Sequence, residues 1–211
     1  MELSRLKQIK TFLLHNSKVL KKQKKQLNTI PKNQKLDDLS YDMHIWLSPP
    51  IAIESAIAIH DMLINIIPKK KYLIDQNLKT FKKKMMFIEK KIKNKLHSIK
   101  EKKYFVFHNA YQYFEKYYKI YPLKAFINFP GIQTGVKELY DIKKNLQKHQ
   151  ASCIFIEPQF NTNIINIITR GTNIRTCVLD PLGTSIPLSQ DSYIKFLFQL
   201  SNQYIRCLNK H

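Results

Sequence analysis

The chain has 211 residues, of which 44% are hydrophobic, and a formal net charge of +21 at pH 7. This length and composition suffice to bury the core of an ordinary globular protein. No apolar run approaches the roughly 20 residues that a membrane-spanning helix needs. The N-terminus also lacks the apolar segment and cleavage site of a secretory signal peptide. The sequence therefore predicts a globular protein that does not span a bilayer.

The positive charge raises the question of nucleic-acid binding, because lysine and arginine neutralise phosphates. Only four of the 36 basic residues are arginine, which is the residue that binds guanine edges and phosphates through two parallel hydrogen bonds. The lysines are instead spread along the faces of predicted helices. We therefore expect no nucleic-acid partner, and a basic polyanion-binding module stays as an alternative.

The first half of the chain predicts two helices after a lysine-rich, poorly periodic start. Ser48 is a good N-cap and Pro49 suits the first helical position, so a helix should begin there and end before Pro68. From Ile74 to Ile99 apolar residues recur every three or four positions. This spacing predicts a helix of about 26 residues and about 40 Å. We interpret it as a spine between two lobes, with a coiled coil as the alternative.

The second half alternates between strand and helix patterns. Each of four short apolar strands is followed by a helical segment, and the last helix covers residues 193–209. The predicted strands are residues 104–107, 123–127, 152–156 and 174–179. Successive strand–helix units of this kind indicate an α/β fold with a four-stranded, mostly parallel sheet covered by helices.

Polar side chains follow three of these strands. His108 comes after the first strand, Glu157 after the third and Asp180 after the fourth. Ligands of open parallel sheets bind beyond the carboxyl ends of the strands. Imidazole nitrogen suits zinc and tetrahedral sites accept a carboxylate, so His108 and Asp180 could form half of a metal site. A structural, hydrogen-bonding histidine is the alternative. Glu157 could bind the metal or hydrogen-bond to one of its ligands, but we expect a buried structural carboxylate bonded to backbone amides.

Sequence motifs for catalysis, redox chemistry and phosphate binding are missing from this sequence. The chain has no Ser-His-Asp arrangement and no Cys-x-x-Cys pair, and four glycines are too few for a phosphate-binding loop. His60 falls in the middle of the first predicted helix and is expected to be a solvated or packing residue. We therefore predict that the protein is not an enzyme.

Four segments together resemble the ZnuA family, the zinc-specific substrate-binding proteins of bacterial ABC uptake systems. The similarity holds in order and spacing, extends from about residue 41 to the last helix, and rests on independent motifs. These are Asp-Met-His-Ile-Trp-Leu-Ser-Pro (42–49), Tyr-Phe-Val-Phe-His-Asn-Ala-Tyr-Gln-Tyr-Phe-Glu-Lys (104–116), Cys-Ile-Phe-Ile-Glu-Pro-Gln-Phe (153–160) and Leu-Asp-Pro-Leu-Gly-Thr (179–184).

The resemblance implies two α/β lobes joined by a rigid helix, which capture Zn²⁺ between them and deliver it to a membrane permease. The family's zinc-binding histidines fall on His44 and His108, and Asp180 lies where related manganese binders supply a carboxylate. In those relatives the position of His108 is a glutamate. A nitrogen donor there favours zinc over the harder manganese ion. Capture should weaken as pH falls through the ordinary histidine range, near 6.5.

Under this resemblance the chain has three parts. Residues 1–68 are the remnant of an N-terminal α/β lobe, residues 69–102 the spine helix and residues 103–211 the C-terminal lobe. Another family histidine lies upstream of this sequence, so we expect an N-terminally truncated member that binds zinc more weakly. A non-functional remnant is the alternative. The resemblance also implies a periplasmic monomer.

Three cysteines are present, and the resemblance implies a disulfide between Cys153 and Cys207. Such a bridge would close a loop of about 55 residues and stabilise the fold by roughly 4 kcal/mol in an oxidising compartment. Three buried thiols are the alternative. A bridge to Cys177 would instead require a different placement of the last helix.

Overall fold

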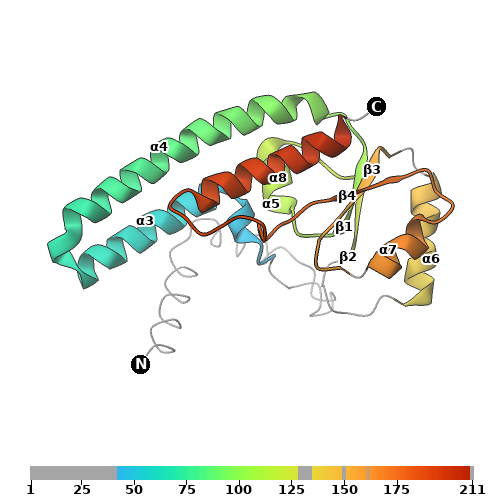
Figure 1. The fold of residues 1–211 in the computed structure, drawn as a ribbon, viewed down its shortest axis with the longest axis horizontal. Helices are drawn as coiled ribbons and strands as arrows, with labels where there is room; N and C mark the ends of the chain where they lie inside the picture. Colours follow the sequence, from blue (N-terminus) through green and yellow to red (C-terminus); the bar gives the residue numbers. More distant parts are fainter. Residues whose placement is uncertain (1–41, 128–134, 149–150, 161, 210–211) are drawn as a thin grey trace, which may run out of the picture. The chain divides into compact units, whose positions relative to one another are not determined.

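The structure is a computed structural model that describes residues 42–127, 135–148, 151–160 and 162–209 (Figure 1). The helix fragment predicted before residue 41 lies outside the described residues. The chain forms two compact units, of which the first ends at Met85 and the second begins at Met86. The boundary therefore falls inside the long helix α4, Lys71–Leu96. The three-part division with a separate spine stays a prediction.

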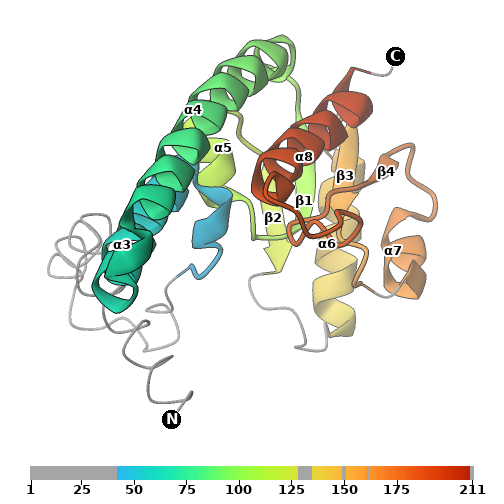
Figure 2. The same ribbon diagram turned by 60° about the vertical axis from the view of Figure 1, so that its left-hand side comes forward.

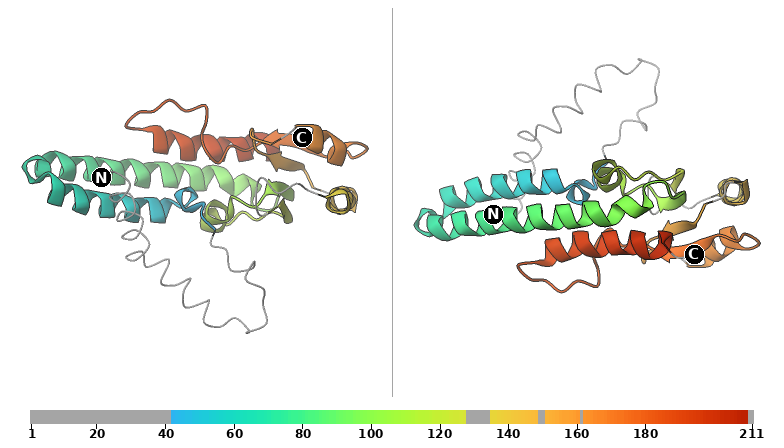
Figure 3. Two further views of the ribbon diagram at one scale, coloured as in Figure 1. Left: turned by 90° about the horizontal axis from the view of Figure 1, so that it is seen from below. Right: turned by 90° about the horizontal axis from the view of Figure 1, so that it is seen from above.

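The described part of the first unit consists of helices. A short 3-10 helix, Ile45–Leu47, precedes α3, Pro49–Ile66, and a second short one, Pro68–Lys70, leads into α4. The Ser48 hydroxyl accepts a hydrogen bond from the amide of Ile51 at 3.4 Å, and Pro49 occupies the first turn of α3. This is the helix start that the sequence predicts. Figure 3 shows α3 side by side with the N-terminal half of α4.

The second unit is built on a four-stranded parallel sheet, as predicted. The strands are β1, Tyr104–His108; β2, Lys124–Ile127; β3, Cys153–Ile156; and β4, Arg175–Val178. Their order in the sheet is β2-β1-β3-β4, and every pairing is parallel. Central strand β1 is buried along its whole length, which explains its continuous apolar and aromatic sequence.

Helices cover both faces of this sheet (Figure 2). The helices are α5, Gln112–Tyr118; α6, Val136–Lys148; α7, Thr162–Thr169; and α8, Ser192–Leu208. Phe105, Phe107 and Ile154 pack with α6 and α7 in one apolar cluster. Tyr104 and Phe155 point the opposite way, because side chains alternate along a strand, and both contact Tyr204 of α8.

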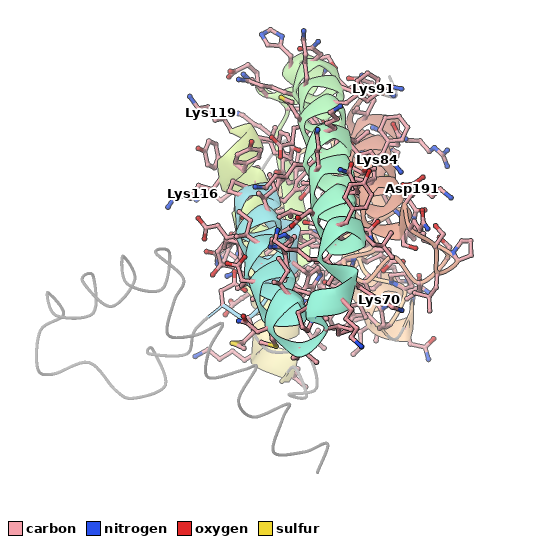
Figure 4. The ribbon with its side chains drawn as sticks, turned by 90° about the vertical axis from the view of Figure 1, so that its left-hand side faces the viewer. Lys70, Lys84, Lys91, Lys116, Lys119 and Asp191 are labelled. Atoms are coloured by element: carbon pink, nitrogen blue, oxygen red, sulfur yellow. A yellow bond between two sulfur atoms is a disulfide. The ribbon has the colours of Figure 1, made fainter. Side chains whose placement is uncertain are left out.

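Several lysines lie on the surface of the second unit. Figure 4 shows Lys116 and Lys119 extending outward from the region of α5. Lys91 and Lys95 of α4 place their ammonium groups 4.8 and 4.9 Å from the ring centroid of Phe198, so their stems cover α8. Within the described residues no helix combines the length and apolarity needed to cross a membrane.

Candidate metal centre

The parallel sheet gathers three predicted site residues at one of its edges. His108 ends β1, Glu157 follows β3 and Asp180 lies two residues after β4. Parallel strands place their carboxyl ends at the same end of the sheet. Strands β1, β3 and β4 are neighbours in this order, so the residues that follow them lie close together. All three side chains are buried, with 3%, 6% and 3% of their residue surface exposed. The fold thus concentrates buried polar groups where ligands of such sheets bind.

His108 is held in one orientation by Glu157. Its Nδ1 lies 2.7 Å from the Glu157 carboxylate oxygen Oε1, and its ring meets the Phe160 ring edge-on with centroids 6.0 Å apart. An ionised carboxylate can only accept a hydrogen bond, so in a neutral imidazole the proton sits on Nδ1 and Nε2 keeps its lone pair. Zinc-binding histidines use the same arrangement, in which a carboxylate at one ring nitrogen orients the other toward the metal.

Glu157 is in turn placed by Tyr111. The Tyr111 hydroxyl lies 3.2 Å from Glu157 Oε1 and 2.7 Å from the carbonyl oxygen of Leu179. Burial, followed by the Glu157 charge, raises the pKa of Tyr111 well above its ordinary value, so the hydroxyl stays a donor. The expected bonding of Glu157 to backbone amides is wrong, because its carboxylate pairs with an imidazole and a phenol instead.

Asp180 organises the loop that follows β4. Its Oδ1 accepts the amides of Leu182 and Gly183 at 3.0 and 3.1 Å, and its Oδ2 accepts the amide and hydroxyl of Thr184 at 2.7 and 2.8 Å. A carboxylate offers about four lone-pair sites. Coordination of a metal by Asp180 would therefore displace at least one of these hydrogen bonds. Its role as a ligand stays a prediction.

His44 shows a similar arrangement within the first unit. Its Nδ1 lies 2.7 Å from Asp42 Oδ1, and its backbone amide donates to the same oxygen at 3.0 Å. Its carbonyl accepts the amide of Leu47, and its ring centroid is 5.3 Å from that of Trp46. Asp42 was not predicted from the sequence as the partner of this imidazole. Its position two residues upstream was an available signal.

A further carboxylate, that of Glu115, is buried on the α8 side of the sheet. Glu115 of α5 accepts hydrogen bonds from the hydroxyls of Tyr104 and Tyr204, each at 3.0 Å. Burial raises the pKa of Glu115 to about 7, although the two tyrosine hydrogen bonds act in the opposite direction. This side of the sheet therefore contains a polar network in addition to apolar packing.

The predicted disulfide between Cys153 and Cys207 is wrong. The bridge joins Cys177 to Cys207, with their Cα atoms 6.1 Å apart, and Cys153 is a buried free thiol. The physical reason is that the last turn of α8 meets edge strand β4, where Arg175 Nη2 donates to the Cys207 carbonyl at 3.0 Å. Helix α8 nevertheless lies where the sequence predicts it. The expectation that this bridge would require a different placement was therefore also wrong.

Comparisons with known proteins identify the family. Residues 3–207 match the family model ZnuA, described as zinc-uptake complex component A, periplasmic. The chain is 55% identical over 208 residues to the high-affinity zinc uptake system protein ZnuA of Buchnera aphidicola subsp. Schizaphis graminum, covering 99% of this chain and 66% of the relative. It is 49% identical over 168 residues to ZnuA of Yersinia pestis, covering 80% of this chain and 53% of that protein.

A solved structure supports the fold independently. The periplasmic zinc-binding protein TroA of Treponema pallidum superposes with a TM-score of 0.70 at 16% identity, over 87% of this chain and 70% of that one. At this level of identity the likeness concerns the fold. The chain spans 66% and 53% of the lengths of the two curated relatives above. The match over residues 3–207 shows that the chain belongs to the ZnuA family of zinc-uptake substrate-binding proteins.

Proposed function

We propose that this chain binds Zn²⁺ as the substrate-binding component of an ABC uptake system and delivers the ion to a membrane permease. Both relatives described above are named high-affinity zinc uptake proteins, and the family description places the component in the periplasm. We extend that role and location to this chain, as a monomer that neither catalyses a reaction nor binds nucleic acid. His44 and His108 are the proposed ligands, with Asp180 or water completing the shell.

The carboxylate–imidazole pair at His108 is the observation that carries this proposal. The side chain is buried, so its orientation is determined by its contacts, and its Nδ1 is 2.7 Å from Glu157 Oε1. The pair leaves Nε2 as the nitrogen with a lone pair for a metal. His44 shows the same Nδ1–carboxylate distance of 2.7 Å, to Asp42. In both histidines a carboxylate lies at Nδ1 and leaves Nε2 for a ligand. This arrangement suits a metal that prefers nitrogen donors, and zinc is such a metal.

Zinc titration of purified variants by calorimetry tests the ligand assignment. His108→Ala should weaken zinc binding by at least about tenfold, because it removes one coordinating nitrogen. His97→Ala is the matched control, since His97 is an exposed histidine of the same unit, and should bind zinc like the wild type. The same affinity in His108→Ala and the wild type would contradict the assignment. A folded wild type without measurable affinity would favour the remnant alternative.

The orienting role of Glu157 has its own test. Glu157→Gln keeps the shape of the side chain and a carbonyl oxygen that can still accept from Nδ1, but it removes the negative charge that strengthens this hydrogen bond and polarises the imidazole. Loss of a group that orients a metal-binding histidine lowers metal affinity about 10- to 100-fold. The matched control is Glu101→Gln, at an exposed glutamate of the same unit. Unchanged zinc affinity in Glu157→Gln would show that the carboxylate does not orient the ligand.

A further inference from the structure

Three sulfur atoms meet between the sheet and the last helix. The Sγ atoms of Cys153, Cys177 and Cys207 all lie within 4.8 Å of one another. Cys153 opens β3, Cys177 lies on the neighbouring strand β4, and Cys207 lies in the last turn of α8. The disulfide joins Cys177 to Cys207, and Cys153 is a free thiol. Reduction of this one bond would therefore leave three thiols in one place.

We propose that the reduced chain binds one thiophilic divalent cation, of the class of Zn²⁺ and Cd²⁺, through the sulfurs of Cys153, Cys177 and Cys207. A dithiol reductant gives two electrons and two protons to the Cys177–Cys207 bond, which becomes two thiols, and is itself oxidised to a disulfide. The cation then binds the three sulfurs, which lose their protons to solvent. The disulfide excludes the cation, because bridged sulfurs are not thiolates. This inference does not depend on the proposed histidine site.

The distances between the cysteines suit a metal–thiolate site. With zinc–sulfur bonds of about 2.3 Å, sulfurs around one zinc ion lie about 4 Å apart. Sγ of Cys153 is already within 4.8 Å of the other two sulfurs. The Cα atoms of Cys177 and Cys207 are 6.1 Å apart, so rotation about their Cα–Cβ bonds can separate the two sulfurs to this distance after reduction. Three ligands can therefore surround one ion with little change in the backbone.

The charges around the three sulfurs favour a divalent cation. Three thiolates and one divalent cation leave a single negative charge, which needs a positive neighbour in a buried place. Arg175 is such a neighbour, since its Nη2 donates to the Cys207 carbonyl oxygen at 3.0 Å. Its charge also acts on Cys153, where burial raises the pKa of the thiol to about 12 and Arg175 acts in the opposite direction. One guanidinium thus offsets the net charge of the occupied site.

The burial of the three cysteines leaves an approach from one side. Cys153 and Cys207 are 0% and 2% exposed, whereas Cys177 is half-buried on the edge strand β4. An ion can therefore reach the sulfurs from the side of Cys177, where water can take the fourth position of a tetrahedral site. Thiolate ligands favour zinc-type cations over magnesium and calcium, which prefer oxygen.

Titration of the full wild-type chain with Cd²⁺ tests the proposal, because Cd²⁺ held by thiolates absorbs ultraviolet light through sulfur-to-metal charge transfer. Imidazole and carboxylate ligands do not produce this absorption. The chain is reduced with a dithiol, separated from the reductant in the absence of oxygen, and titrated beside the oxidised chain. We expect absorption that saturates at one Cd²⁺ per reduced chain and is absent from the oxidised chain. A reduced chain without this absorption would overturn the proposal.

Two variants separate this site from a two-sulfur site and from the proposed histidine site. Reduced Cys153→Ser should bind Cd²⁺ at least about tenfold more weakly than the reduced wild type, because it lacks one of three thiolates. Reduced His108→Ala should keep the absorption and the affinity of the wild type, even if zinc binding by the histidines fails altogether. Equal affinity in Cys153→Ser and the wild type, or loss of the absorption in His108→Ala, would contradict the three-sulfur site.

A melting experiment on the reduced wild type shows whether the folded chain is the form that binds. Cd²⁺ should raise its melting temperature, because the three sulfurs come together only in the folded state. A melting temperature that Cd²⁺ leaves unchanged or lowers would mean that the ion binds the cysteines of the unfolded chain, and the proposal would fall. This measurement needs no substitution, so it decides the question even if a variant does not fold.

Discussion

The two faces of the sheet differ in the kind of core that they carry. Against α6 and α7 the described core cluster is formed by aliphatic and aromatic side chains, among them Phe105 and Ile154. Against α5 and α8 the buried layer also contains ionisable groups, such as Glu115, which two tyrosine hydroxyls hold. The pair of His108 and Glu157 lies where strands β1 and β3 end.

This difference indicates that the two faces contribute differently to the stability of the unit. An apolar layer stabilises the fold through buried area and packing, and it tolerates changes that conserve volume. A buried polar layer contributes less net stability, but it orients its members strictly because an unsatisfied group in the interior is costly. The apolar face therefore supports the sheet, while the polar groups hold an imidazole in position.

A cavity in the apolar face should have the largest effect on stability. Phe105 is almost fully buried, and its ring stacks on Phe126 with centroids 5.1 Å apart. Phe105→Ala should lower the free energy of unfolding by about 3–5 kcal/mol, measured by urea denaturation. Val136→Ala, at a residue of α6 that is 86% exposed, is the control and should change it by less than about 0.5 kcal/mol. The zinc affinity of folded Phe105→Ala should match that of the wild type. A large loss of affinity would show that the apolar face also affects metal binding.

Neutralising Glu115 on the polar face should change how stability depends on pH. Burial raises the pKa of Glu115 from 4.5 to about 7, so the folded state prefers the protonated form. The stability that this preference contributes is fully present below about pH 4.5 and is lost as pH rises through about 7. Glu115→Gln lacks this loss and can still accept the two tyrosine hydrogen bonds. Above pH 7 it should exceed the wild type in stability by up to about 3 kcal/mol.

The measurement for Glu115 is urea denaturation of both proteins across the pH range from about 4 to about 8. The difference in unfolding free energy between Glu115→Gln and the wild type should grow over that range. A difference that does not vary with pH would mean that Glu115 titrates normally. In that case burial would not raise the pKa of Glu115, and its surroundings would not exclude water.

The smallest expected effect comes from the half-buried His60 and its two more exposed aspartate partners, which serve as a reference for the buried pair of His108 and Glu157. His60 lies between Asp61 and Asp75, each with a carboxylate oxygen 2.8 Å from a ring nitrogen. The hydrogen bond to Asp61, followed by that to Asp75, raises the pKa of His60 above 6.5. Its stabilising contribution is therefore present below pH 6.5 and is lost as pH rises through the raised pKa.

Titration by NMR should show a lower His60 pKa in Asp61→Asn, and a smaller decrease in Asp75→Asn, because the Asp61 hydrogen bond is the larger cause. Since both aspartate side chains reach solvent, which screens their charges, neither change should alter stability beyond the small range typical of surface ion pairs. A pKa that stays raised in both variants would mean that the aspartates do not cause the shift. Asp141→Asn, at an exposed aspartate in the other unit, is a control that should leave His60 unchanged.

Sequence patterns predicted the elements well because each pattern reflects a local constraint. The apolar spacing of α4 and the cap at Ser48 depend on residues within a few turns, and the observed helices agree with them. The four strands begin and end within about two residues of their predicted bounds. The resemblance to the ZnuA family, made from four short motifs, was confirmed by a family match over residues 3–207.

Pairings between distant residues could not be predicted in the same way. The partner of His108 lies 49 residues away, and only the neighbouring positions of β1 and β3 in the sheet bring the two together. The disulfide depended on a finer choice, because Cys153 and Cys177 present sulfurs to the same end of α8. The spacing of the cysteines in the sequence does not indicate which of the two bonds to Cys207. The pairing depends on which strand lies at the edge of the sheet.

The loop from Asp180 to Thr184 has a consequence for how this protein can vary. Gly183 has a φ of +64°, and a Cβ atom there would lie 2.8 Å from Cδ2 of Phe196. A mutational library built on this loop would therefore retain almost exclusively glycine at position 183, whereas the exposed Leu182 beside it could change freely. Tolerance to substitution thus alternates between adjacent positions, and the record of past selection on this loop should show the same alternation.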